Sequence, residues 1–178
     1  MRYLILSVCF FLAFCAQAQR PGNSDWSTES EFRSEEPKII KNIQWLEENP
    51  VATPVNDTKA ISEYILSWLA KVPYLEVTMD YTLLSGIVDN DNFKYGEKFR
   101  VTYLFGKSFY YIEHQENANE EEAIYRGTIA MVKVYRELKK YDPAMKNKPL
   151  AKYSKLQESG KLRAYVQNRI AEIEAIVE

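Results

Sequence analysis

Cysteine and histidine, which often act as nucleophiles, bases or metal ligands, are scarce in this chain. Its 178 residues include two cysteines and one histidine. Cys9 and Cys15 both lie in a segment that the sequence predicts to be cleaved, which would leave no disulfide, thiol nucleophile or cysteine-ligated metal. A phosphate-binding glycine loop, a Gly-x-Ser-x-Gly elbow and an ordered Ser/His/Asp set are also missing. The sequence therefore predicts no catalytic residues, no metal ligands and no cofactor.

The N-terminus has the pattern of a secretory signal peptide. Arg2 precedes an apolar run at 4–16, and a small-x-small motif ends at Ala18. The apolar run is too short to span a bilayer. A lipoprotein signal is the alternative, but it needs a small residue before the cysteine, and Phe14 precedes Cys15. We expect cleavage near Ala18 and a periplasmic or extracellular protein without a transmembrane segment in the mature chain.

The charge balance argues against nucleic acid as a partner. The chain has 23 Lys and Arg against 25 Asp and Glu, a formal net charge of −2. Since Arg2 is the only charge in 1–18, cleavage makes the net charge about −3. Residues 19–34 are polar and predict a flexible leader. Residues 35–178 are expected to form a single helical domain, which is long enough to bury a core without disulfides.

Two long helices at 95–114 and 119–141 are expected to organise the fold. Apolar residues recur in both at spacings of three and four, so each helix has one apolar face that must be buried. The two stripes are Val101, Leu104, Phe105, Ser108, Phe109 and Ile112, and Ile124, Thr128, Met131, Tyr135 and Leu138. The prediction is an all-α bundle of about seven helices around this central antiparallel pair.

The other helices are marked by their caps and breakers. Ser34 is expected to cap a helix that ends before Pro50, and a second helix runs from a cap near Asp57 to Pro73. Two more helices follow Pro149 and Gly160. The segment 74–92 is ambiguous, because 76–82 has strand-forming residues while its apolar residues fit helical spacing. We favour a helix there.

His114 is the one residue that suggests catalysis. Next to Glu113 it could act as a general base or a metal ligand, as in a small hydrolase. The alternative is a cation placed favourably at a helix C-terminus, and the absence of a second histidine favours it. The acidic turn at 89–97 lacks the glycine and the oxygen ligand that a calcium loop requires at its centre.

Tyrosines and glycines in the first central helix provide candidates for a binding site. Tyrosine suits both pocket walls and helix packing, because it is apolar with a polar tip. Gly106 and Gly127 each cost helix stability, and close contact between helices would explain both. A ligand against the bare backbone is the alternative explanation. The candidate ligand-binding residues are Tyr103, Gly106, Tyr110, Tyr111 and His114.

Several short motifs are shared with a known group of proteins. They are Tyr103-Leu104-Phe105-Gly106, Tyr111-Ile112-Glu113, Gly127, Val134-Tyr135, Gly160-Lys161-Leu162 and Tyr165-Val166. With these motifs the chain resembles small secreted all-α proteins of unknown function from Bacteroidota. The resemblance would cover most of the mature chain, but it provides no activity and no catalytic residues. In general plan the chain is also similar to periplasmic immunity proteins that block cell-wall toxins.

The combined features favour a secreted or periplasmic helical protein that binds a protein or a small molecule and is not an enzyme. The first alternative is an immunity-type inhibitor of a cell-wall toxin. The second is a small hydrolase that uses Glu113 and His114. Convergence of His114 and the acids in a cleft would favour the hydrolase, and their exposure to solvent would favour a binding protein.

Overall fold

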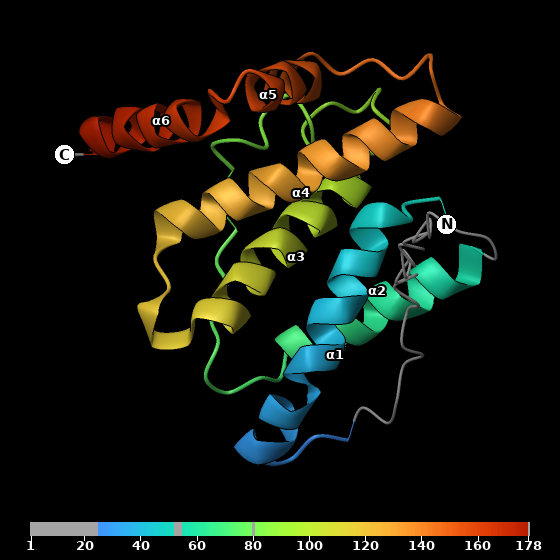
Figure 1. Ribbon diagram of the computed structural model, residues 1–178, viewed down its shortest axis with the longest axis vertical. Coiled ribbons are helices and arrows are strands. Elements are labelled where there is room, and N and C mark those ends of the chain that lie inside the picture. Colours follow the sequence, from blue (N-terminus) through green and yellow to red (C-terminus); the bar gives the residue numbers. More distant parts are fainter. Residues whose placement is uncertain (1–24, 52–54, 80, 178) are drawn as a thin grey trace, which may run out of the picture.

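The computed structural model describes residues 25–51, 55–79 and 81–177. The regular secondary structure of these residues consists of helices, without a strand. The all-α fold class is therefore confirmed (Figure 1). The elements are α1 (Glu29–Glu48), α2 (Val55–Leu69), α3 (Gly96–His114), the 3-10 turn η1 (Gln115–Asn117), α4 (Glu120–Tyr141), α5 (Lys148–Glu158) and α6 (Leu162–Val177). In this part of the chain, no helix is both long and apolar enough to cross a membrane. The predicted signal peptide at 1–18 lies outside the described residues.

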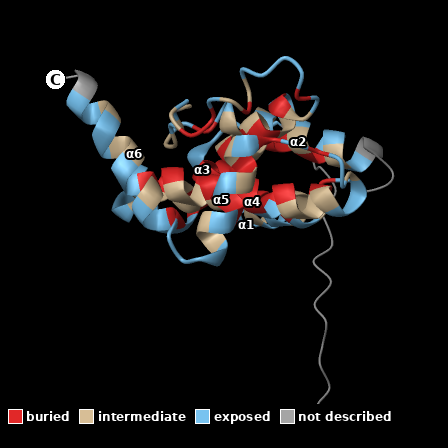
Figure 2. Ribbon diagram, turned by 90° about the horizontal axis from the view of Figure 1, so that it is seen from above, coloured by how far each residue is buried: buried red, intermediate tan, exposed pale blue. Residues whose placement is uncertain are grey.

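Helix α3 lies in the middle, with α4, α5 and α6 on one side and α1 and α2 on the other (Figure 1). Phe99 and Tyr103 pack into a core shared with α4, α5 and the segment 83–93. Phe105, Phe109 and Ile112 pack into a second core with α1 and α2. Figure 2 shows the buried residues gathered along α2, α3 and α4, while the far end of α6 is exposed. One helix thus separates two cores.

The contact between α3 and α4 is close at the two glycines. A Cβ added to Gly106 would lie 2.8 Å from the Cα of Gly127 and 2.8 Å from the Cβ of Ala130. A Cβ added to Gly127 would lie 2.8 Å from the Cδ2 of Tyr103. The close helix contact predicted at these glycines is therefore confirmed.

A buried carboxylate ties α1 to α4. The Glu47 side chain is 3% exposed, and its two oxygens pair with Arg126 at 2.6 Å and with Lys133 at 3.0 Å. The Arg126 guanidinium also lies over the Phe109 ring, 4.3 Å from its centroid. Because a buried charge is tolerated only when it is paired, these two cations hold the C-terminal part of α1 in place.

Helix α1 begins at Glu29, so the predicted start after Ser34 is wrong. Thr28 and Glu31 form a capping box: the Thr28 hydroxyl accepts from the Glu31 amide at 3.3 Å, and the Glu31 carboxylate accepts from the Thr28 amide at 2.9 Å. Hydrogen bonds from the Ser27 and Thr28 amides lower the pKa of Glu31 to about 2.

Aromatic packing explains the early start of α1. Phe32 is buried, with its ring centroid 6.2 Å from that of Trp68 on α2. Trp26 packs on Phe32 at 5.6 Å and on Tyr64 at 5.5 Å. Burial of these rings offsets the entropy lost on ordering a polar segment. Part of the segment assigned to the leader, 29–34, is thus the first turns of α1.

The predicted helix over 74–92 is also wrong. Its described residues have no regular structure at 75–79 and form turns from 82 onward, and no strand is present at the described positions of 76–82. Gly86 has φ +74°, which interrupts a helix, and the adjacent residues Leu83 and Leu84 are both fully buried. The Asn147 side chain donates to the Gly86 carbonyl at 2.9 Å, and the Tyr153 hydroxyl donates to the Leu83 carbonyl at 3.1 Å. Carbonyl groups that would accept hydrogen bonds from the backbone of a helix accept them here from Tyr153 on α5 and from Asn147, the N-cap of α5.

Candidate functional site

Tyr103 and Gly106, two of the five predicted binding residues, lie inside the contact between α3 and α4. Both are buried, and Tyr103 has no exposed surface. The ring and the carbonyl oxygen of Tyr103 occupy the space that a Gly127 side chain would need. These residues therefore shape the helix contact, and the structure places them away from the cavities described below.

Tyr110 and His114 form a stacked pair at the end of α3. Their ring centroids are 4.0 Å apart with an interplanar angle of 21°, and His114 Nδ1 lies 2.9 Å from the Tyr110 carbonyl oxygen. The Tyr110 hydroxyl accepts a hydrogen bond from the Asn119 side chain at 3.3 Å. His114 is exposed, and its ring contacts Tyr110 through both the stacking and the hydrogen bond. In the described residues, no group of three or more His, Cys, Asp or Glu side chains could hold a metal ion.

Tyr111 contacts an ion pair between the buried Lys107 and the half-exposed Glu120. Its hydroxyl donates to Glu120, and burial together with this carboxylate raises the pKa of Tyr111. The second Glu120 oxygen accepts from Lys107 Nζ at 2.5 Å. Lys107 is fully buried and also donates to the Thr78 carbonyl at 2.8 Å. The arrangement holds the start of α4 and the backbone at Thr78 against α3.

Tyr111 also lines a polar cavity of about 370 Å³ between α1 and the end of α3. Arg33 lies 4.0 Å from the Tyr74 ring centroid and donates to the Gln115 side chain at 2.9 Å. The Tyr74 hydroxyl donates to Glu36 at 2.8 Å. Gln115 has φ +49°, a strained conformation for a residue with a side chain, which these contacts hold in place. Four polar side chains of this wall, Arg33, Glu36, Tyr74 and Gln115, are therefore occupied with one another.

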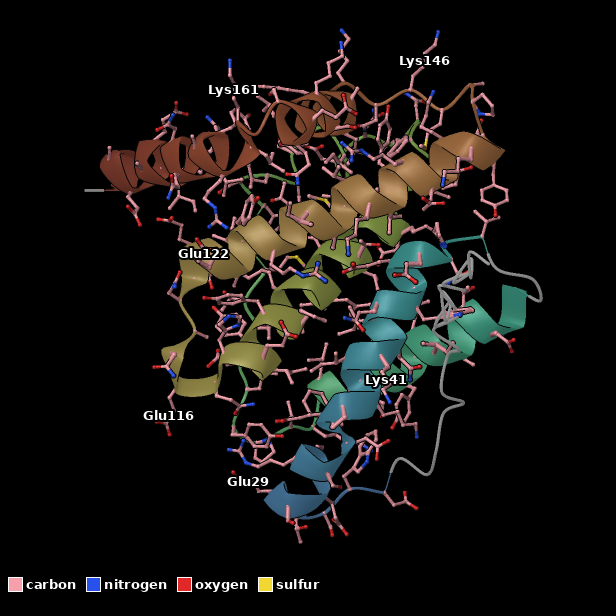
Figure 3. The ribbon with its side chains drawn as sticks, viewed as in Figure 1. Glu29, Lys41, Glu116, Glu122, Lys146 and Lys161 are labelled. Carbon is pink, nitrogen blue, oxygen red and sulfur yellow. The ribbon has the colours of Figure 1, made fainter. Side chains whose placement is uncertain are left out.

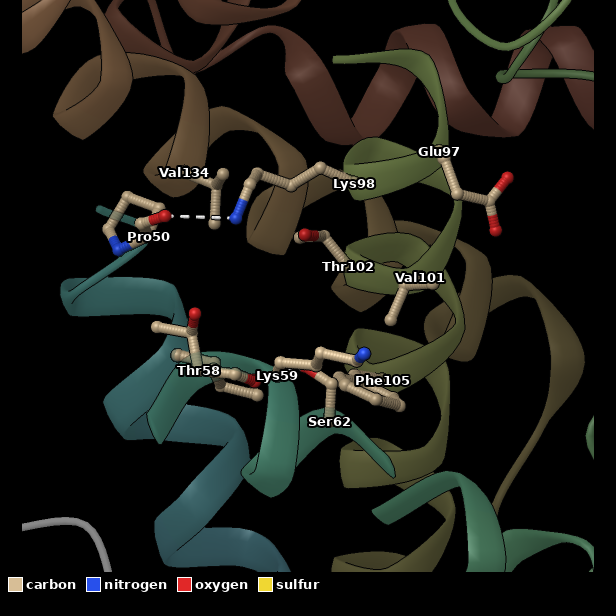
Figure 4. A pocket seen from close by; sticks show the side chains of 11 residues that line it. Pro50, Thr58, Lys59, Ser62, Glu97, Lys98, Val101, Thr102, Phe105 and Val134 are labelled. Atoms are coloured by element: carbon tan, nitrogen blue, oxygen red, sulfur yellow. Dashed lines mark hydrogen bonds between the residues drawn. The ribbon is translucent and has the colours of Figure 1, made fainter. Parts of the chain in front are cut away.

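A second cavity, of about 260 Å³, is mostly apolar and lies between the end of α1, the start of α2 and the outer side of α3 (Figure 4). We refer to it as the Lys98 cleft. Its walls combine aliphatic and aromatic groups with a few hydroxyl groups and charged side chains. The lining residues are Leu46, Pro50, Thr58, Lys59, Ser62, Glu97, Lys98, Val101, Thr102, Phe105 and Val134.

Lys98 is the unusual residue of this cleft. Its ammonium group is partly buried and donates to the Pro50 carbonyl at 2.9 Å (Figure 4). Burial lowers the pKa of Lys98, because the charged form loses its hydration. Glu97 points away from it and pairs with Arg100 at 3.3 Å, while Lys59 is exposed and lies 3.7 Å from Glu63. Perturbed ionisable groups in a cleft are frequent at functional sites.

Lys98 was absent from the predicted site, although its spacing marks it. It lies three residues before Val101 and seven before Phe105, so it falls on the predicted apolar face of α3. A lysine inside an apolar stripe is the signal that would have identified it. The opposite wall comes from α1 and α2, which only the tertiary fold brings to α3.

Comparison with protein-family models, with curated proteins and with solved structures gives no match for this chain.

Proposed function

We propose that the protein is a non-enzymatic binding protein that acts in the periplasm or outside the cell and holds its ligand in the Lys98 cleft. The observation that carries this proposal is an apolar cavity of about 260 Å³ with a single partly buried ammonium group at its edge. Cavities with apolar walls and a few placed polar groups are the usual form of ligand sites. The pattern of residues 1–18 supports the location.

The volume of the cleft limits the size of the ligand. Typical ligand pockets measure about 300–1,000 Å³, so this cleft suits a small molecule or one side chain of a partner. A hexyl chain has five methylene groups and one methyl group, and burial of each carbon contributes about 0.8 kcal/mol. The gross gain of about 5 kcal/mol corresponds to a dissociation constant no lower than about 0.3 mM for a purely aliphatic probe.

A titration with 1-hexanol, followed by two-dimensional NMR of the backbone amides, tests this proposal. We expect saturable shifts at cleft residues such as Val101 and Phe105, with a dissociation constant in the millimolar range. The variant Ser62→Phe should abolish these shifts, because the larger ring enters the space between α2 and α3 (Figure 4). Uniform small shifts over the whole surface would contradict a built site.

Ser34→Phe is the matched control. Like Ser62, Ser34 lies on a helix and donates its hydroxyl hydrogen to a backbone carbonyl of its own helix at 2.8 Å. Ser34 is exposed on α1 and is not part of the cleft. Binding of hexanol should be unchanged in this variant. If both variants lose binding, the effect comes from general instability, and the melting temperatures would show it.

A further inference from the structure

The position of Lys98 is unfavourable in two independent ways. The residue lies in the first turn of α3 (Gly96–His114), where the helix dipole disfavours a positive charge. Its ammonium group has also given up part of its hydration for one hydrogen bond to a neutral carbonyl. A methionine of similar length would avoid both disadvantages, so packing alone does not explain a lysine here.

The described residues leave this charge without an ionic partner. The acid next to Lys98 in sequence, Glu97, pairs with Arg100, and Lys59, the other cation among the lining residues, lies 3.7 Å from Glu63. Two hydroxyl residues, Thr58 and Thr102, line the same cavity as Lys98. The cleft thus offers one partly buried positive charge and nearby hydroxyl groups beside an apolar wall, and Glu97, the carboxylate among its lining residues, pairs with Arg100 and not with Lys98.

We propose that the Lys98 cleft is specific for a small monoanion, namely a carboxylate attached to a short aliphatic group. This inference rests on the proposed binding function. The carboxylate pairs with the Lys98 ammonium in place of the Pro50 carbonyl, and the aliphatic group lies against Val101 and Phe105. A charge-assisted hydrogen bond of this kind is stronger than a neutral one, and stronger still where water is excluded.

One cation matches one negative charge, which is the reason for naming a carboxylate. A phosphate group carries close to two charges and presents three acceptor oxygens, and its sites combine several basic or amide donors. Lys59 is the other cation among the lining residues, but it is exposed and faces Glu63. The cleft therefore lacks the donor set that a phosphate requires.

The test compares hexanoate, 1-hexanol and hexylammonium, which share one chain and differ in the charge of the head group. We expect the wild-type protein to bind hexanoate at least about tenfold more tightly than hexanol, and hexylammonium more weakly than hexanol. Lys98→Met should reduce hexanoate binding to the level of hexanol without weakening hexanol itself. Lys41→Met is the control, since Lys41 is exposed on α1 (Figure 3), and it should change nothing.

The outcomes separate this inference from the proposed function. Equal binding of hexanoate and hexanol to the cleft would overturn the inference and leave the binding function intact. If none of the three probes shifts the cleft amides, the binding function itself is wrong. If Lys98→Met does not fold, Lys98→Arg tests the same point. This variant keeps the positive charge and should keep the preference for hexanoate over hexanol. Loss of that preference in a folded Lys98→Arg variant contradicts a charge-based site.

The same carboxylate chemistry occurs in free short-chain acids and at the C-terminus of a peptide. N-acetyl-leucine and its amide distinguish these two sources in the same assay. Tighter binding of the free acid than of both its amide and hexanoate, lost in Lys98→Met, supports a peptide end as the ligand. Tighter binding of hexanoate than of N-acetyl-leucine supports a free acid. Equal binding of N-acetyl-leucine and its amide, together with equal binding of hexanoate and hexanol, contradicts recognition of the carboxylate.

Discussion

Alanine at Gly106 or Gly127 should destabilise the protein, although alanine is the better helix former. In a helix interior, Gly→Ala alone would stabilise by up to about 1 kcal/mol. Here the new methyl group would lie 2.8 Å from the Gly127 Cα in one variant, and 2.9 Å from the Tyr103 carbonyl oxygen in the other. Normal contact distances are about 3.5–4.0 Å, so α3 and α4 would have to separate by about 0.7 Å.

This separation affects the whole contact between the two central helices. Because backbone atoms are among the obstacles, rotation of one side chain cannot relieve the clash. Overpacking of a core costs about 1–3 kcal/mol, which exceeds the propensity gain. We expect each variant to lose about 1–2 kcal/mol, or about 2–8 °C in melting temperature for a chain of this size. The double variant should lose less than the sum, since one separation accommodates both methyl groups.

Urea unfolding followed by circular dichroism measures these changes, with calorimetry for the melting temperatures. Ala164→Gly supplies the control, because Ala164 is exposed on α6 (Leu162–Val177) and reports helix propensity without packing. It should lose up to about 1 kcal/mol. A rise in stability for Gly106→Ala or Gly127→Ala would refute the close-contact argument.

Two further predictions concern buried polar groups. Glu120→Ala should lower the free energy of unfolding by about 3 kcal/mol, because it leaves the fully buried Lys107 ammonium without its carboxylate. Lys107→Met should lower it by about 1 kcal/mol, since the half-exposed Glu120 stays solvated. Urea unfolding in which Lys107→Met is the costlier variant would contradict this order. Burial, with a smaller effect of Tyr165, raises the pKa of Tyr153 above its ordinary value of 10.0. The folded and the unfolded protein therefore both keep the Tyr153 hydroxyl proton below pH 10, and only the unfolded protein loses it as the pH rises further. The free energy of unfolding should then fall above pH 10, by up to about 1.4 kcal/mol per pH unit from this residue. Urea titrations at a series of pH values should show a shallower fall for Tyr153→Phe. An equal fall with pH in the two proteins would exclude this cause.

The sequence by itself determined the helical class and the inner face of α4, whereas the predicted stripe of α3 was confirmed only in part, because Val101 and Leu104 are partly exposed and Phe99 and Tyr103, outside the stripe, are fully buried. The stripe of α4 from Ile124 to Leu138 is buried as the spacing of three and four required, and Asn119 caps that helix through the Glu122 amide at 2.9 Å. The close approach at Gly106 followed from the same logic, because a helix keeps a costly glycine where a neighbour needs the space. The helical class, the cap and the stripe are local properties, because they depend on residues within a few turns of one another, and the glycine signals only that some neighbouring helix comes close.

The tertiary structure decided where the chain departs from helical spacing and where a ligand has room. The segment 74–92 has helical periodicity, but α5 and its N-cap supply hydrogen bonds that let it form turns around Gly86. The Lys98 cleft unites wall residues from four helices, α1, α2, α3 and α4, that are distant in sequence. No local pattern encodes such an arrangement, since it depends on how α1 and α2 dock on α3. The sequence alone shows a lysine on an apolar face, and the fold shows that this lysine borders a cavity.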